Sequence, residues 1–142
     1  MQDLDKVFYP KSIAIIGASP DPKSQGNGYV AAHQEHNFPG NIYPVHPNAE
    51  SVRGLKTYKT ILDIPHDVDY VISNVPNTSA LELVHQSAKK NVKVIQFFTA
   101  RFSETGIPEM AQLENELLNV AKKHGIRIIG PNCMGVFHPG NG

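Results

Sequence analysis

Ser12-Ile13-Ala14-Ile15-Ile16-Gly17-Ala18-Ser19 is the stretch that decides the fold, and a loop through Ser24, Gly26 and Gly28 follows it. An apolar, largely β-branched run that stops at a glycine and leads through small residues into a helix is typical of the first βα unit of an α/β sheet. The start of that helix presents backbone N–H groups that suit a phosphate. The stretch therefore predicts a nucleotide-binding α/β domain.

Strand-like and helix-like patterns alternate along the rest of the chain. The predicted strands cover 12–16, 42–45, 69–75, 92–98 and 126–129, and the predicted helices cover 26–37, 81–89 and 109–124. Between 48 and 67 the pattern favours a short strand and one helical turn. This alternation is typical of βαβ units with right-handed crossovers. It predicts a Rossmann-like, doubly wound α/β domain with a mainly parallel sheet of five or slightly more strands and helices on both faces.

Composition limits the classes of function. The chain has 142 residues, 40% of them hydrophobic, enough for one domain with its own core. Its 13 basic and 13 acidic side chains cancel without a basic run, so we expect no nucleic-acid partner. No segment approaches the roughly 20 apolar residues of a membrane span, so we expect no membrane partner. Cys133 is the single cysteine, which excludes an internal disulfide and favours the reducing cytoplasm.

Ligands of doubly wound sheets bind outside the carboxyl ends of the strands. The segments that follow the predicted strands are all small, polar or turn-forming, although loops in general are rich in such residues. The candidate site loops are 17–19, 46–48, 75–77, 98–100 and 130–132.

The first loop departs from the dinucleotide fingerprint G-x-G-x-x-G, which an acidic residue about 20 positions later completes. Ser19 stands at the second glycine, the next glycine is Gly26, and the second strand ends at His46-Pro47-Asn48 without a carboxylate. An ordinary NAD site is therefore disfavoured. The wider loop suits a pyrophosphate with a 3′-phosphorylated ribose, held by the hydroxyls of Ser19 and Ser24 and by helix N–H groups.

Four stretches resemble one family in order and spacing: 8–19, 40–47, 98–106 and 125–135. They are similar to the N-terminal CoA-binding domain of NDP-forming (ADP-forming) acyl-CoA synthetases, relatives of the succinyl-CoA synthetase α subunit. The likeness runs from about Leu4 to about Pro139. It implies a ligase that joins a carboxylic acid to CoA, coupled to ATP or GTP through an acyl phosphate and a phosphohistidine, with this domain holding CoA or an acyl-CoA.

The resemblance also implies site residues, each matched by position. Gly17, Ala18, Ser19 and Gly26 match the phosphate loop. Beyond this loop, the matching positions are Pro47 and Asn48 at the nucleotide end, Val75 and Pro76 beside the adenine or pantetheine, Thr99 and Ala100 under the pantetheine arm, and Asn132 and Cys133 in the turn toward the phosphorylated histidine.

The chain departs from the family pattern at three of these loops. The family commonly has lysine where this chain has Asn48 and often where it has Ser24, so point charges that would face phosphates are missing. Lys23 or Lys11 are candidates to replace them. The family usually carries glycine at Arg101, which predicts a different loop shape there, with a solvated arginine favoured over a phosphate contact.

No histidine occupies the place of the family's catalytic histidine, which lies in a following domain. His46 and His138 fall near site loops, where a surface role is favoured over a catalytic one. No histidine pair has a metal spacing with Cys133, so we expect no metal site. Cys133 suits a packing thiol in a tight turn better than a nucleophile. We therefore predict no catalytic residue in this chain.

The sequence thus predicts a CoA-binding domain over 1–139 and the start of a linker over 140–142. The expected partners are CoA and the downstream ligase and ATP-grasp domains or subunit, and a homo-oligomer is left open. Two alternatives stay open: an NAD(P)-binding module of an oxidoreductase or redox sensor, and a CoA-sensing domain fused to a partner such as an acetyltransferase.

Overall fold

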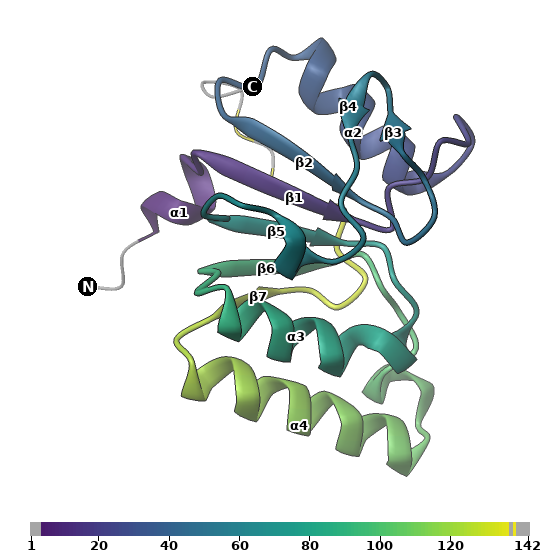
Figure 1. Cartoon of the computed structure of the whole chain (residues 1–142). Helices are drawn as coiled ribbons and strands as arrows, with labels where there is room; N and C mark the ends of the chain where they lie inside the picture. Colours follow the sequence, from purple (N-terminus) through teal and green to yellow (C-terminus); the bar gives the residue numbers. More distant parts are fainter. Residues whose placement is uncertain (1–3, 137, 139–142) are drawn as a thin grey trace.

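A five-stranded parallel sheet forms the centre of the molecule in the computed structural model, which describes residues 4–136 and 138 (Figure 1). The predicted fold class is confirmed. The strand order is β2-β1-β5-β6-β7, and every neighbouring pair is parallel. The strands are β1 (Ser12–Ile16), β2 (Asn41–Val45), β5 (Tyr70–Ser73), β6 (Val94–Phe97) and β7 (Arg127–Ile129).

Helices cover both faces of this sheet, as the βαβ pattern predicts. On one face, α1 (Asp5–Phe8) and α2 (Gln25–Glu35) pack through Val7 and Val30. On the other, α3 (Ala80–Lys89) and α4 (Pro108–Lys123) lie side by side (Figure 1), and both contribute to the larger apolar cluster, for example through Val84 and Leu117. Successive residues of β1 serve opposite faces, so the strand is buried along its whole length.

The order of the strands places a switch point between β1 and β5. From β1 the chain runs through α2 to β2 on one side, and then returns across the sheet to β5 on the other. The return segment holds the two-stranded hairpin β3 (Ser51–Val52) and β4 (Leu55–Lys56) and the 3-10 turn η1 (Ile61–Asp63). The predicted short strand of this region is thus a hairpin. Its tip carries positive φ at Arg53 and Gly54, as a tight hairpin turn requires.

Pro44 confirms the edge position that its lack of an N–H predicts for the second strand. β2 is the edge strand of the sheet. On its open side the Pro44 carbonyl accepts a hydrogen bond from Tyr58 N–H at 3.0 Å, so the backbone beyond β4 partly covers the edge.

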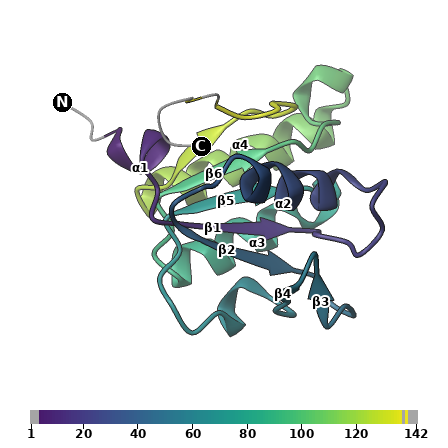
Figure 2. The same ribbon diagram turned by 90° about the horizontal axis from the view of Figure 1, so that it is seen from above.

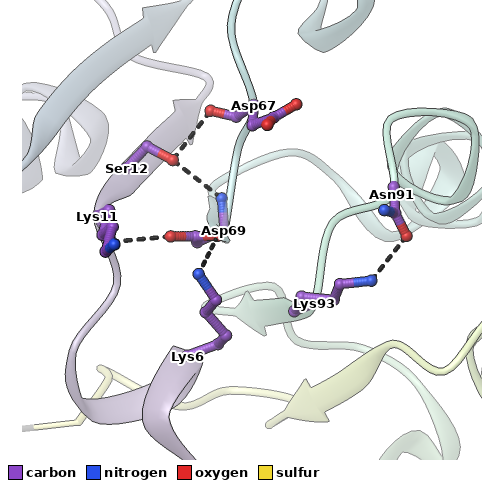
Figure 3. A network of polar contacts seen from close by, with 7 residues as sticks. All are labelled: Lys6, Lys11, Ser12, Asp67, Asp69, Asn91 and Lys93. Carbon is purple, nitrogen blue, oxygen red and sulfur yellow. Dashed lines mark hydrogen bonds and ion pairs between the residues drawn. The ribbon is translucent and has the colours of Figure 1, made fainter.

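α1 is a short helix that the sequence analysis did not predict, and polar contacts at the amino ends of the strands tie it to the sheet. Asp69 accepts from the Lys11 N–H at 2.8 Å and forms an ion pair of 2.8 Å with Lys6 of α1 (Figure 3). Ser12 Oγ donates to the Asp67 carbonyl and accepts from Asp69 N–H. α1 and the loop after β1 lie at opposite ends of the sheet (Figure 2).

Helix α4 ends at Lys123, and β7 is followed by a cis Gly130-Pro131 bond that leads into the last described segment. The predicted domain limit at 139 and the predicted linker at 140–142 lie outside the described residues. Within the described part of the chain, none of the helices has the length and apolarity needed to cross a membrane.

Candidate functional site

The switch point between β1 and β5 is bordered by Gly17 after β1 and Asn74 after β5. Gly17 has a φ of +81°, and a Cβ there would come within 3.1 Å of the Asn74 carbonyl oxygen. Asn74 N–H in turn donates to the carbonyl of Ile16, which brings the two strand ends together. Only glycine combines this left-handed conformation with so close a neighbour.

Helix α2 rests directly on the same loop through Gly26. A Cβ on Gly26 would lie 2.2 Å from the Gly17 carbonyl oxygen and 2.8 Å from the Ala18 Cα. A Cβ on Gly28, two positions after Gly26, would lie in open space. The predicted role of Gly26 beside the phosphate loop therefore has a packing basis, whereas Gly28 has none.

The loop between β1 and α2 is held by its own side chains. Ser19 Oγ accepts from Asp21 N–H at 3.1 Å, and Ser24 Oγ caps α2 by accepting from Asn27 N–H at 3.1 Å. Asn27, which is 4% exposed, donates its side-chain amide to the Ser19 carbonyl at 3.0 Å. The sequence analysis missed Asn27, although an asparagine in the first turn after a glycine-rich loop is a detectable signal.

Hydrogen bonds within the loop determine which of its N–H groups remain as donors. Gly17 and Ala18 both donate their N–H groups to the Val45 carbonyl, at 3.0 and 3.1 Å. They join β1 to the end of β2 instead of offering donors. The donors that remain at the loop are the Ser19 and Ser24 hydroxyls and the first N–H groups of α2 at Gln25 and Gly26, which have no partner within a helix.

A hydrogen-bonded row joins the loops after β5, β6 and β7. Thr99 Oγ1 donates to the Val75 carbonyl at 2.7 Å, and the Thr99 carbonyl accepts from Asn132 N–H at 2.9 Å. Cys133 N–H donates to the Phe97 carbonyl at 3.1 Å. The structure thus brings together predicted site residues from three separate loops, with Pro76 and Ala100 beside them at the surface.

Pro47 and Asn48 lie apart from this row, on the exposed turn after the edge strand β2. His46 holds the turn, because its Nδ1 accepts from the N–H groups of Asn48 and Ala49 at 3.2 and 3.1 Å. This contact gives His46 a structural role in the turn. The hydrogen bonds from Gly17 and Ala18 to the Val45 carbonyl connect the strand before this turn to the phosphate loop.

Arg101 adopts a φ of +73°, the left-handed conformation that glycine favours. Its N–H donates to Glu104 Oε1, its carbonyl accepts from the Asn77 side chain at 2.6 Å, and its own side chain is exposed. The loop after β6 therefore keeps a glycine-like backbone although the residue is arginine. The exposed side chain fits the solvated role that we favoured.

Asn74 is a second polar residue that the sequence analysis missed. Among the described residues, neither polar atom of its buried side-chain amide has a hydrogen-bond partner. Buried amides of folded proteins are nearly always paired. An amide able to donate and to accept therefore lies at the switch point, beside Gly17.

The remaining candidates add no catalytic constellation in the described ranges. His138 packs its ring against Phe8 and Tyr9, with centroids 5.8 and 4.9 Å away, at the α1 end of the molecule. Cys133 is half-buried, with its Sγ 3.8 Å from the Gly135 carbonyl. In residues 4–136 and 138, no group of three or more His, Cys, Asp or Glu side chains is placed to hold a metal ion.

A parallel, doubly wound sheet with a glycine loop and a capped helix start at its switch point defines a nucleotide-binding domain of the Rossmann-like class. Comparison with known families narrows this class. Residues 11–139 match the CoA binding domain family, so the chain belongs to that family. This assignment favours CoA over NAD(P), the alternative that the fold alone left open.

Several characterised relatives are longer ligases. The chain is 44% identical over 140 residues to the ADP-forming acetate–CoA ligase II of Archaeoglobus fulgidus, covering 99% of this chain and 21% of that protein. It is 42% identical over 135 residues to the ADP-forming acetate–CoA ligase II subunit alpha of Pyrococcus furiosus, covering 95% and 29%. The chain thus spans less than a third of the length of these relatives.

A solved structure shows the same fold. The acetyl-coenzyme A synthetase 1 of Ca. Korarchaeum cryptofilum, described as dinucleotide forming and solved with phosphate and ADP, superimposes with a TM-score of 0.91 at 35% identity. The match covers 99% of this chain and 30% of that one. The domain described here is therefore one part of a larger architecture in that protein.

Proposed function

We propose that this chain binds CoA or an acyl-CoA at the carboxyl edge of its sheet, across the switch point between β1 and β5. The observation that carries the proposal is the close contact of Gly26 with Gly17, which sets the start of α2 against the loop after β1 in a chain of the CoA-binding family. The helix start and the Ser19 and Ser24 hydroxyls suit the phosphates.

The remaining groups suit the rest of the ligand. The row of Val75, Thr99 and Asn132 supplies a surface for the pantetheine arm, and Cys133 lies at its end. The buried Asn74 amide, whose donor and acceptor are unpaired among the described residues, lies beside Gly17 at the switch point. Pro76, Ala100, Pro47 and Asn48 border the site at the surface. The site is thus divided into a polar half at α2 and a backbone-lined half at the later loops.

The domain serves, in our proposal, a larger NDP-forming acyl-CoA synthetase of the cytoplasm. The relatives named for ADP-forming acetate–CoA ligation support this class, since the chain aligns along nearly its whole length with part of each. Residues 1–139 would form the CoA-binding unit, and 140–142 would lead toward further ligase and ATP-grasp portions. The reacting acid is then a carboxylic acid that these other portions select.

The test is calorimetric titration of the chain with CoA, acetyl-CoA, NADH and NADPH at one salt concentration. We expect binding of both CoA species and no heat from either dinucleotide. Binding of NADH alone, or of none of the four, would contradict the proposal. The full-length gene product, joined to ligase portions or to an acetyltransferase, would separate the ligase from the CoA-sensing alternative.

Gly26→Ala and Gly28→Ala form a matched pair for locating the site. The Gly26 methyl group would overlap the Gly17 carbonyl and displace the start of α2, so we expect affinity for CoA to fall about tenfold or more. Gly28→Ala meets no neighbouring atom and replaces a helical glycine, so it should keep the affinity and raise stability by up to about 1 kcal/mol. Equal affinities in the two variants would place CoA elsewhere.

A further inference from the structure

Gln96 of β6 is a polar side chain, 2% exposed, on the sheet face that α2 covers. Its Nε2 donates to the Cys133 carbonyl at 3.1 Å and to the Tyr29 hydroxyl at 3.3 Å, and its Oε1 accepts from the Tyr70 hydroxyl at 3.2 Å. Tyr29 of α2 donates onward to the Met134 carbonyl at 2.8 Å. One buried amide thus joins β6, α2 and the segment 133–135.

The backbone acceptors determine the direction of every hydrogen bond in this network. The Cys133 and Met134 carbonyls can only accept, so the Gln96 amide nitrogen and the Tyr29 proton must point toward them. The Oε1 atom then takes the remaining donor, the Tyr70 hydroxyl. Burial raises the pKa of both Tyr29 and Tyr70, so both hydroxyls keep their protons at neutral pH. The network therefore has one arrangement in which all of its groups are paired.

The segment 133–135 depends on these bonds because its side chains contribute little packing. Met134 is 74% exposed, and Gly135 has no side chain. Gly135 also passes close over the amide: with a φ of +129°, a Cβ there would lie 3.0 Å from Gln96 Oε1. The segment is thus held through its backbone, by Tyr29 and Gln96 and by the bond from Cys133 N–H to Phe97.

We infer that Tyr29 and Gln96 are positioning residues for the ligand site, which couple the 133–134 backbone to helix α2. Tyr29 lies about one helical turn after Gly26 in α2. The same helix therefore carries the start proposed to face the phosphates and the hydroxyl that binds the Met134 carbonyl. Helix α2 therefore fixes the distance between the polar half of the proposed site at its start and the backbone-lined half at the later loops. The expected effect of this network on affinity rests on the proposed CoA site. Its expected effect on the segment 133–135 rests on the hydrogen bonds alone.

Tyr29→Phe and Tyr70→Phe test the inference as a matched pair. Each removes one hydroxyl from the network, but only Tyr29 contacts the segment. In the ligand-free protein, alkylation of Cys133, the single cysteine, by iodoacetamide reports how firmly the segment is held. We expect Tyr29→Phe to speed alkylation about fivefold, as for one lost hydrogen bond, and Tyr70→Phe to change it less than about twofold.

The same pair is then titrated with acetyl-CoA, which has no free thiol. The dissociation constant should rise about fivefold in Tyr29→Phe and stay within about twofold in Tyr70→Phe, even where both variants melt at lower temperature. Equal alkylation and affinity in Tyr29→Phe and the wild type would overturn the inference, as would equal effects of the two variants.

Two further outcomes have their own interpretation: a wild type that binds no acetyl-CoA, and a Tyr29→Phe variant that does not fold. If the wild type binds no acetyl-CoA, the proposed function fails, while the alkylation rates still decide whether the network holds the segment. If Tyr29→Phe does not fold, Gly135→Ala loosens the same contact from the segment side, because its methyl group presses on Gln96. Its alkylation should also be faster, and an unchanged rate would count against the inference.

Discussion

At the scale of single residues, Arg101 adopts a left-handed backbone conformation that suits glycine better than arginine. A left-handed φ costs an L-residue about 1–2 kcal/mol, and Arg101 holds +73° between the Glu104 and Asn77 contacts. Those contacts involve the Arg101 backbone, so they are available to any residue except proline. The loop is therefore defined by its hydrogen bonds and not by the arginine side chain.

Arg101→Gly should stabilise the protein by about 0.5–1 kcal/mol, since the relief of the left-handed conformation exceeds the extra entropy of glycine in the unfolded chain. Arg101→Val should destabilise it by about 1 kcal/mol or more, because a β-branched residue fits this region poorly. Urea unfolding midpoints measure both. A stabilised valine variant would show that backbone strain is not the determining factor.

Asn48 is the position where a restored charge has the clearest expected effect. Its turn is exposed and held through His46, so a longer side chain meets no packing barrier. We expect Asn48→Lys to tighten CoA binding about two- to fivefold at low salt, the range of one exposed ion pair, and to lose this gain as salt rises. Asn48→Gln is the neutral control. Affinity that does not depend on salt would mean that the ligand phosphates lie away from this turn.

Some of the residues at the candidate site could be predicted from the sequence, and others could not. Gly17 and Gly26 stood out because a glycine in a loop after an apolar run implies a close approach. Asn27 was missed although its place in the first turn after the glycine-rich loop is a signal. Asn74 and Gln96 carry no such signal, because a single amide along a chain has no period or spacing. Asn74 matters because its amide is buried without a partner among the described residues, and Gln96 because its partner Cys133 comes from a distant segment.

At the scale of elements, α2 combines the helix start at the candidate site with a titratable group near its end. His33 is half-buried, its Nδ1 lies 2.7 Å from the Tyr29 carbonyl, and its ring meets Phe38 edge-on at 5.6 Å. Burial lowers the pKa of His33, the nearby His36 lowers it further, and the bond to Tyr29 opposes both. The folded state therefore favours the neutral ring.

Stability should consequently fall as the pH drops below 6.5, the pKa of an unperturbed histidine. Below that value the unfolded chain binds a proton at His33 and the folded chain does not, until the lowered folded pKa is reached. The slope from this group is at most about 1.4 kcal/mol per pH unit. Chemical unfolding between pH 7.5 and 5 should show a smaller slope in His33→Gln and the wild-type slope in the exposed control His85→Gln. Identical slopes in all three proteins would contradict this assignment.

The elements themselves were largely predictable because their patterns are local. Buried parallel strands are apolar throughout, as in β1, and α4 repeats apolar residues along one face. The short elements were predicted incompletely for the same reason: α1 was missed, and one short strand was predicted over 48–67 where the structure has the hairpin of β3 and β4. The four residues of α1 and the two-residue strands β3 and β4 are too short for a period, and tertiary contacts such as Lys6 to Asp69 hold α1 in place.

At the scale of the whole molecule, we expect the chain to bind CoA without completing a ligase cycle, since it spans less than a third of the length of its ligase relatives. Mixed with CoA, acetate, ATP and magnesium, it should form no thioester above the blank. In the same samples CoA should raise the melting temperature, since a ligand at 100 times its dissociation constant stabilises by about 2.7 kcal/mol. Sustained thioester formation by this chain alone would show that it contains catalytic groups that we did not identify.

The sequence by itself determined the fold class, the family and the loops that follow the carboxyl ends of the strands. Apolar periods and glycine spacing are local, and parallel strands bring their carboxyl ends to one edge in any doubly wound sheet. Only the tertiary structure decided how these loops are joined: that Gly17 and Ala18 donate to Val45, that Thr99 joins two loops, and that Gln96 and Tyr29 hold the segment after Cys133. These contacts link residues far apart in the chain, and their partners are chosen by burial, which requires each polar group to find a hydrogen bond inside the fold.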